Sequence, residues 1–86
     1  QEHETEILKV YPNPANDFIT IESNLFLSAN SEIKLFDLIG NLILSKKVDD
    51  SKFKSQLIDI SALSKGTYIV SVFNGAKSNY TRIVIN

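Results

Sequence analysis

The chain has 86 residues, of which 43% are hydrophobic and 22% charged, and its formal net charge is −1. This size and composition predict one small globular domain, and the near-neutral charge excludes an electrostatic surface that would attract nucleic acid or a membrane. The absence of cysteine excludes disulfides and sulfur-based zinc sites, and no apolar run reaches the length of about 20 residues that a membrane-spanning helix needs.

The first six residues are polar and mainly acidic. They predict a linker, residues 1–6, that joins an upstream domain to a folded module over residues 7–86. The only histidine, His3, lies in this linker without a serine, cysteine or acid placed to work with it, so neither a catalytic nor a metal-binding role is expected.

Two prolines, Pro12 and Pro14, are separated by one residue. Each fixes its own φ angle and lacks a backbone donor, and the preceding residues Tyr11 and Asn13 are driven toward extended geometry. This stretch therefore predicts a rigid elbow between two short strands, and neither a helix nor a central strand fits it.

Alternating apolar residues separated by turn residues predict six or seven short strands. These strands are expected over residues 7–11, 18–22, 32–38, 42–48, 53–60, 67–73 and 80–85. Residues 24–31 are expected to form a loop that caps the core, with one helical turn as the alternative, and residues 49–52 a second loop. With no long helix predicted, the fold class is all-β: an antiparallel immunoglobulin-like β-sandwich of about seven short strands.

Turn chemistry predicts how several strands are joined. Either Gly40 or Asn41 is expected at positive φ in a tight hairpin, and Asn74-Gly75 is a strong signal for another. Between these hairpins, residues 61–66 predict a compact turn that Ser61 caps and a glycine closes, with a leucine directed inward.

Acidic residues offer two kinds of candidate site. Asp37 and Asp59 interrupt their strands and could form a catalytic carboxylate pair, but acids beside turns usually accept hydrogen bonds from backbone N–H groups, which is the interpretation favoured here. Residues 49–51 could supply oxygens to Ca²⁺, but they lack EF-hand spacing, so a solvated turn is expected.

The three tyrosines could form an aromatic platform for a sugar. Tyr68, however, alternates with two valines, which favours packing in the core with its hydroxyl bonded at the rim. Residues 79–81 match the N-glycosylation triplet, a short pattern that has meaning only where a compartment glycosylates it.

Taken together, three segments resemble a known family: residues 10–14 with their two prolines, residues 33–40, and residues 58–68. In this order, and followed by a β-branched terminal strand, they are similar to the C-terminal sorting domain of the type IX secretion system, the Por system of Bacteroidota, in its type A class. The resemblance covers residues 7–86.

This resemblance implies an immunoglobulin-like β-sandwich at the end of an exported cargo protein. Outer-membrane type IX secretion machinery would recognise the module and carry the cargo from the periplasm to the cell surface or the medium. A sortase-like protease would cleave within residues 1–6 and join the cargo to anionic lipopolysaccharide. The module would be a substrate and not an enzyme, with no cofactor, no nucleic-acid partner and no small-molecule substrate.

The resemblance also assigns the residues of the signal. They are Pro12, Asn13 and Pro14 of the proline motif, Gly66 and Tyr68 of a Gly-x-Tyr motif, and Arg82, Ile83, Val84, Ile85 and Asn86 of the terminal signal. Many members end in a basic residue, whereas this chain ends in asparagine. If the last strand forms a sheet edge, its backbone groups are the ones most available to a partner strand, and edge strands could also pair two copies into a homodimer.

The alternative function is an immunoglobulin-like spacer or carbohydrate-binding module of a secreted surface enzyme. A sorting domain must lie at the extreme C-terminus of its parent protein, whereas further domains could follow a spacer. Position in the parent gene therefore separates the two readings.

Overall fold

The computed structural model describes residues 7–24, 31–48 and 55–86, and it confirms the predicted order of seven strands. They are β1 (Leu8–Tyr11), β2 (Phe18–Ser23), β3 (Ser31–Asp37), β4 (Leu42–Val48), β5 (Ser55–Asp59), β6 (Gly66–Phe73) and β7 (Ser78–Ile85). The described residues contain no α-helix, and so none that is long and apolar enough to cross a membrane.

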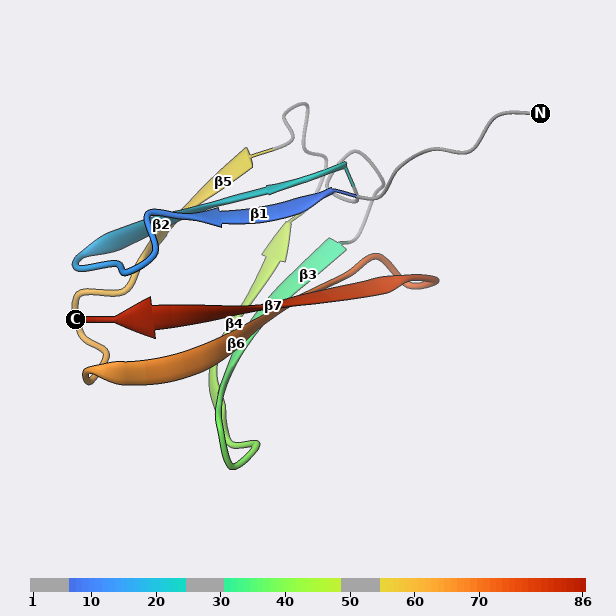
Figure 1. Ribbon diagram of the computed structural model, residues 1–86. Helices are drawn as coiled ribbons and strands as arrows, with labels where there is room; N and C mark the ends of the chain where they lie inside the picture. The colour runs from blue at the N-terminus through green and yellow to red at the C-terminus, as the bar shows by residue number, and fades with distance from the viewer. Residues whose placement is uncertain (1–6, 25–30, 49–54) are drawn as a thin grey trace.

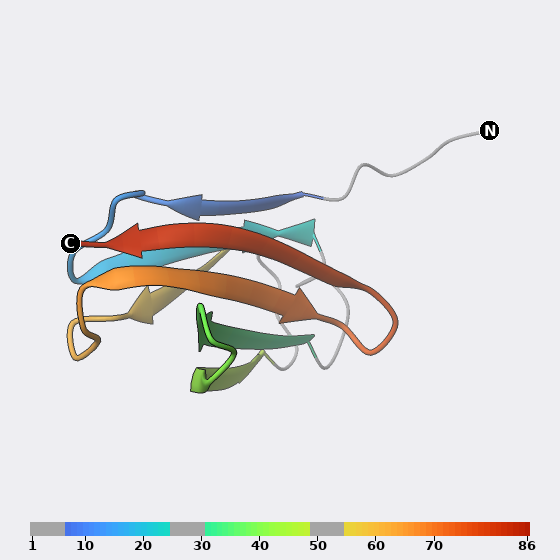
Figure 2. The same cartoon turned by 60° about the horizontal axis from the view of Figure 1, so that its bottom comes forward.

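The strands form two sheets that face each other (Figure 1, Figure 2). One sheet has the order β1-β2-β5 and the other the order β4-β3-β6-β7, and all neighbouring strands within them are antiparallel. This arrangement is the predicted immunoglobulin-like sandwich.

The core follows the period-two pattern of the sequence. On β2 the side chains of Ile19 and Ile21 are fully buried, whereas Phe18 is 49% exposed on the opposite face, as predicted. The other sheet supplies every second residue of β3, β6 and β7. Its buried hydrophobic residues on these strands are Ile33, Leu35, Tyr68, Val70, Val72, Ile83 and Ile85.

The hairpins between β3 and β4 and between β6 and β7 form where the turn residues predicted them, but the second return strand begins earlier than expected. Gly40 has φ +94° in the hairpin between β3 and β4, a conformation that glycine adopts without steric cost. The hairpin between β6 and β7 is a loop of four residues, because Phe73 pairs with Ser78 and the Asn74 N–H donates to the Lys77 carbonyl at 3.1 Å. The return strand therefore begins at Ser78, two residues before its predicted start.

The turn between β5 and β6 is capped by a different residue from the one predicted. The Asp59 Oδ1 atom accepts hydrogen bonds from the Ser61 N–H at 2.9 Å and from the Ser61 hydroxyl at 2.6 Å. Ser61 thus acts as a donor to the preceding acid. Leu63 packs partly buried against the core, as expected.

The sandwich has one covered side and one open side. On the covered side β1 runs close to β7, so that the edges of the two sheets meet (Figure 2). On the open side the edge strands β4 and β5 flank a groove. Residues 25–30 of the predicted loop 24–31, the predicted loop at residues 49–52, the start of the predicted strand at residues 53–54 and the linker 1–6 lie outside the described residues. Ser31, predicted as the end of the first loop, is the first residue of β3.

Candidate functional site: the proline elbow and the terminal strand

The three motifs of the expected signal meet at one end of the sandwich. The elbow after β1, the start of β6 and the end of β7 lie together there (Figure 1). Within the sheet, Gly66 is paired with Ile85 and Tyr68 with Ile83. Residues that the sequence separates by more than 50 positions therefore form one continuous site.

The elbow binds the outer edge of β7 through the side chain of Asn13. The Asn13 Oδ1 atom accepts a hydrogen bond from the Val84 N–H at 2.9 Å, and its Nδ2 donates to the Arg82 carbonyl at 3.3 Å. The amide group thus supplies an acceptor and a donor to the strand edge, as the backbone of a neighbouring strand would.

The backbone of Ala15 continues this pairing. Its N–H donates to the Val84 carbonyl and its carbonyl accepts from the Asn86 N–H, both at 2.8 Å. Ala15 and Ile85 form a parallel bridge, and the Ala15 side chain is fully buried. Ala15 is a part of the site that the sequence did not reveal, because an alanine within an elbow carries no local signal.

The proline motif explains why these two residues make the contact. Pro12 and Pro14 have no N–H to donate, so the pairing passes to the side chain between them and to the residue that follows. The Tyr11–Pro12 and Asn13–Pro14 peptide bonds are both cis. Pro12, Asn13 and Pro14 are exposed and form the outer surface of this end.

One expectation about the terminal strand is therefore only half correct. β7 is an edge strand of its sheet, which was the condition of that expectation. The expectation that its last backbone groups are the most available to a partner strand is wrong, because the elbow already binds the Arg82 carbonyl, both backbone groups of Val84 and the Asn86 N–H. Strand addition at this position would have to displace the elbow.

The five terminal residues have two different environments. Ile83 and Ile85 face the core and are 0% and 2% exposed. Arg82, Val84 and Asn86 face outward and are exposed. Alternation along the strand therefore leaves only the second group for direct contact with a partner, and the two isoleucines hold the strand in place.

Gly66 and Tyr68 of β6 also belong to this end of the sandwich, Gly66 at its surface and Tyr68 in the core. Gly66 has φ +150° at the first position of β6, a backbone conformation that favours glycine. Tyr68 is 6% exposed, and its hydroxyl donates to the Ser64 carbonyl at 2.6 Å. The prediction of a core tyrosine bonded at the rim is confirmed.

The alternative sites considered from the sequence do not assemble among the described residues. Tyr11 and Tyr80 lie on different sheets and Tyr68 lies in the core, so the three rings form no common platform. The Glu22 carboxylate accepts a hydrogen bond from the Tyr11 hydroxyl at 3.3 Å. Desolvation and this nearby negative charge raise the pKa of Tyr11 above its ordinary value.

Asp37 and Asp59 end strands of different sheets and each binds its own turn. Hydrogen bonds from the side chain and the backbone N–H of Asn41 lower the pKa of Asp37, and those from the hydroxyl and the N–H of Ser61 lower the pKa of Asp59. Both acids thus bond to backbone N–H groups as predicted. The described ranges contain no group of three or more His, Cys, Asp or Glu residues that could hold a metal; the candidate calcium loop at 49–51 and His3 lie outside them.

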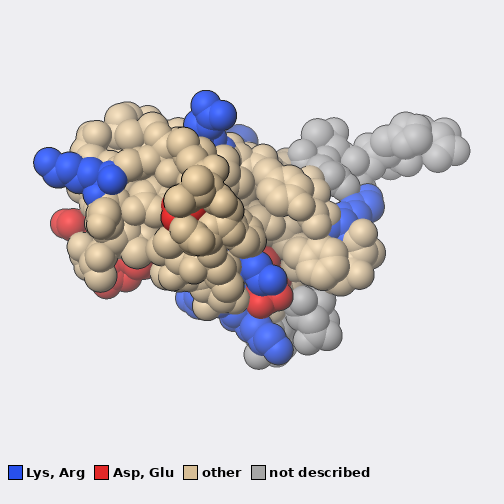
Figure 3. Space-filling model, turned by 90° about the horizontal axis from the view of Figure 1, so that it is seen from below, with Lys and Arg blue, Asp and Glu red and all other residues tan. Residues whose placement is uncertain are grey.

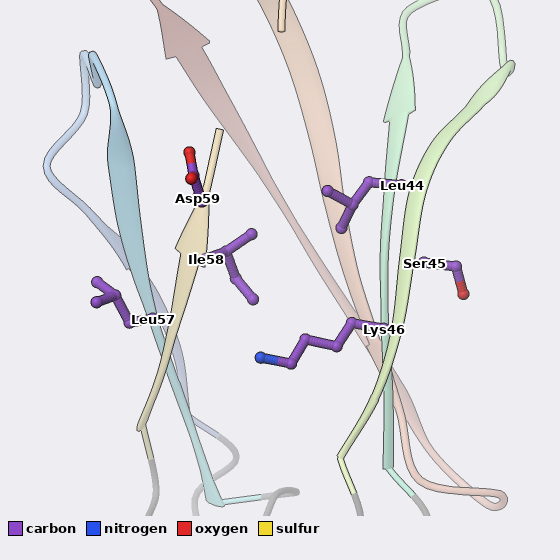
Figure 4. Close-up of a pocket in the computed structure, with 6 residues that line it drawn as sticks. All are labelled: Leu44, Ser45, Lys46, Leu57, Ile58 and Asp59. Carbon is purple, nitrogen blue, oxygen red and sulfur yellow. The ribbon is translucent and has the colours of Figure 1, made fainter. Parts of the chain in front are cut away.

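The groove on the open side has a volume of about 400 Å³. It is lined by Leu44, Ser45, Lys46, Leu57, Ile58 and Asp59. Figure 4 shows Leu44, Lys46 and Ile58 directed into the space between the sheets, whereas Leu57 and Ser45 point away from it. With Lys46 and Asp59 as its only ionisable residues, the lining has no nucleophile–base pair for catalysis.

Comparison with known proteins finds the same family that the sequence motifs resemble. A family model described as "Secretion system C-terminal sorting domain" matches residues 9–86. The chain is also 38% identical over 68 residues to Beta-agarase D of Zobellia galactanivorans. That match covers 79% of this chain and 12% of the agarase, so the similarity concerns a small part of that protein.

Proposed function

The chain belongs to the family of secretion system C-terminal sorting domains, those of the Por or type IX system, and on this basis we propose that outer-membrane translocation machinery recognises it as the export signal of a cargo protein. The observation that carries the proposal is the family match over residues 9–86. A sorting domain is a non-catalytic module, so any activity belongs to the protein to which it is attached. The similarity to part of Beta-agarase D supports an enzyme as the cargo.

The end of the sandwich that holds the elbow and the terminal strand supports the proposal structurally. Pro12, Asn13, Arg82, Val84 and Asn86 are exposed together there and can contact one receptor surface. Tyr68 is buried beneath them, and Gly66, which is itself exposed, begins the neighbouring strand β6. The receptor would contact the combined surface of the elbow and the terminal strand.

Later steps follow from the same proposal. A sortase-like protease would cleave the linker over residues 1–6 after export, and the cargo would be anchored at the cell surface or released. The folded module would then be a cleaved product. Pairing of two modules through edge strands also stays a prediction.

The test is an export assay in a host that has a type IX secretion system. Residues 7–86 are fused to a fluorescent protein directed to the periplasm, and fluorescence is measured at the cell surface and in the medium. The fused reporter should leave the periplasm, whereas the reporter without the module should not. The double variant Lys46→Ala/Lys47→Ala, on β4 and away from the elbow, should be exported like the parent.

Two results would contradict the proposal. One is a correctly folded fusion that stays in the periplasm, as a spacer or a carbohydrate-binding module would. The other is an export level that is the same in an otherwise identical host whose type IX system has been removed.

A further inference from the structure

The outer face of the four-stranded sheet carries an apolar row on three adjacent strands, and the row ends at a cation on the fourth. Strand register places Leu42 beside Phe36, Phe36 beside Ile69, and Ile69 beside Arg82. Paired residues of an antiparallel sheet have side chains on the same face, about 4.5–5.5 Å apart at Cβ. Tyr80 and Val84 lie on the same face of β7, two residues before and after Arg82. These six residues are called the outer-face patch.

This composition is unusual for the solvent side of an antiparallel sheet, which ordinarily carries polar residues. Leu42 is 53% exposed, Tyr80 66% and Val84 37%, and Phe36 and Ile69 are half-buried. From below, the side on which β3 and β4 lie, uncharged residues occupy most of the surface, with acidic atoms visible within it and most Lys and Arg residues near its rim (Figure 3).

The outer face of the three-stranded sheet differs. There the corresponding row reads Tyr11, Thr20 and Leu57, so that a polar residue lies at its centre. Phe18 is paired with the acid Asp59 on the same face. Large apolar residues are therefore present on both outer faces, since Tyr11, Phe18 and Leu57 are also exposed. Only on the four-stranded sheet do three of them, Leu42, Phe36 and Ile69, follow one another in one row of directly paired positions.

The cation of the patch lacks an intramolecular partner among the residues that the structure describes. The Arg82 guanidinium makes neither a hydrogen bond nor an ion pair with any of them. The acid on the same face, Glu32, is engaged with the Ser45 hydroxyl at 3.0 Å and with the Lys34 ammonium at 4.0 Å. An exposed guanidinium at the end of an apolar row is complementary to a carboxylate set within an apolar surface.

We propose that the outer-face patch is a docking surface for a protein of the secretion machinery, and that this protein presents an apolar surface with a carboxylate opposite Arg82. The proposal rests on the proposed function. It adds residues of β4, β3 and β6 to the surface that the secretion machinery would contact. Interfaces of this kind draw most of their affinity from a few buried apolar and arginine contacts surrounded by polar residues.

The test uses the reporter fusion with matched variants of exposed leucines on the edge strands of the two sheets. Leu42→Glu places a charge in the patch, and Leu57→Glu places the same charge on the outer face of the other sheet, where the leucine is 62% exposed. Export of Leu42→Glu should fall at least about tenfold, since the new charge would have to lose its water within an apolar contact without gaining a partner. Export of Leu57→Glu should equal that of the parent.

A second pair tests the charge. Arg82→Glu should lower export at least about tenfold, and Arg82→Lys should retain part of it because the positive charge stays. The thermal midpoint of each purified module shows whether it is folded. If Leu42→Glu does not fold, Leu42→Thr replaces it, because threonine keeps the strand propensity and removes most of the apolar contact.

Three results would overturn the inference. In the first, the parent is exported and the folded Leu42 variant is exported equally well, which leaves the proposed function intact. In the second, sedimentation shows that the purified module is a dimer which Leu42→Glu dissociates, so that a second copy covers the patch. In the third, the parent itself is not exported, and the proposed function fails as well.

Discussion

Asn13 and Val84 are 71 positions apart in the sequence, yet the Asn13 Oδ1 atom accepts the Val84 N–H at 2.9 Å. Together with the bond from Asn13 Nδ2 to the Arg82 carbonyl, this contact makes one side chain act as a short piece of neighbouring strand. Unpaired strand edges are prone to pair with other chains. The elbow therefore stabilises the end of β7 and covers its edge at the same time.

Replacing Asn13 with alanine should destabilise the module by about 0.5–1.5 kcal/mol, the usual net contribution of an intramolecular hydrogen bond. The more specific effect should be local, because the Val84 N–H would be released to solvent. Its hydrogen exchange, followed by NMR, should accelerate relative to that of core amides. Asn16→Ala, in the same elbow, is the control and should leave this exchange rate as it is. Unchanged protection of the Val84 amide in Asn13→Ala would contradict the proposed contact.

Deleting residues 84–86 should destabilise the fold and not only remove a signal. Ile85 is 2% exposed in the core, and loss of a buried isoleucine side chain costs about 2–5 kcal/mol. The bonds of Ala15 to Val84 and Asn86 would be lost as well. Urea denaturation should show a lower midpoint for the truncated module. A midpoint equal to that of the parent would show that the terminal strand contributes little to stability. Export assays on this deletion therefore need a variant of an outward-facing residue, such as Arg82→Glu, which removes a surface contact and leaves the core intact.

Tyr68→Ala should be among the most damaging single substitutions. It removes a large side chain from the core at a cost of about 3–5 kcal/mol, a large part of the stability of a small domain. Tyr68→Phe keeps the ring and loses only the hydrogen bond to the Ser64 carbonyl, so its cost should be about 0.5–1.5 kcal/mol. Tyr80→Ala, at a tyrosine that is 66% exposed, is the control and should change the thermal midpoint least. A larger fall of the thermal midpoint in Tyr80→Ala than in Tyr68→Ala would show that the assignment of Tyr68 to the core is wrong.

Stability should fall in acid because of two carboxylates. The folded-state pKa values of Asp37 and Asp59 are lowered by hydrogen bonds, mainly from Asn41 and Ser61. Their contribution is therefore fully present above the unfolded-state pKa of about 3.9 and is lost as the pH falls through the lower folded-state values. Urea midpoints measured between pH 7 and pH 2 should show this loss. The double variant Asp37→Asn/Asp59→Asn should be less sensitive over the same range, and an equal slope in both proteins would contradict the assignment.

Much of the fold could be read from the sequence because it depends on local chemistry. Side chains alternate across a strand, so the order of apolar residues on β2, β3, β6 and β7 determined which of them face the core. Gly40 at positive φ and the acids that bond to their own turns are also local effects, acting over a few residues. Even where the prediction erred, at the cap after β5, the true acceptor Asp59 is only two residues from the predicted one.

The candidate site depends on both levels of structure. The sequence carried the motifs, and their resemblance to a sorting domain implied that Asn13, Gly66, Tyr68 and the terminal residues belong to one signal. It could not show that Asn13 and Ala15 bind the edge of β7, nor that Leu42, Phe36, Ile69 and Arg82 form one row. Both depend on the order and register of strands that are distant in the chain. Hydrogen bonds and side-chain contacts between such strands exist only once the two sheets have assembled, and no pattern of neighbouring residues specifies them.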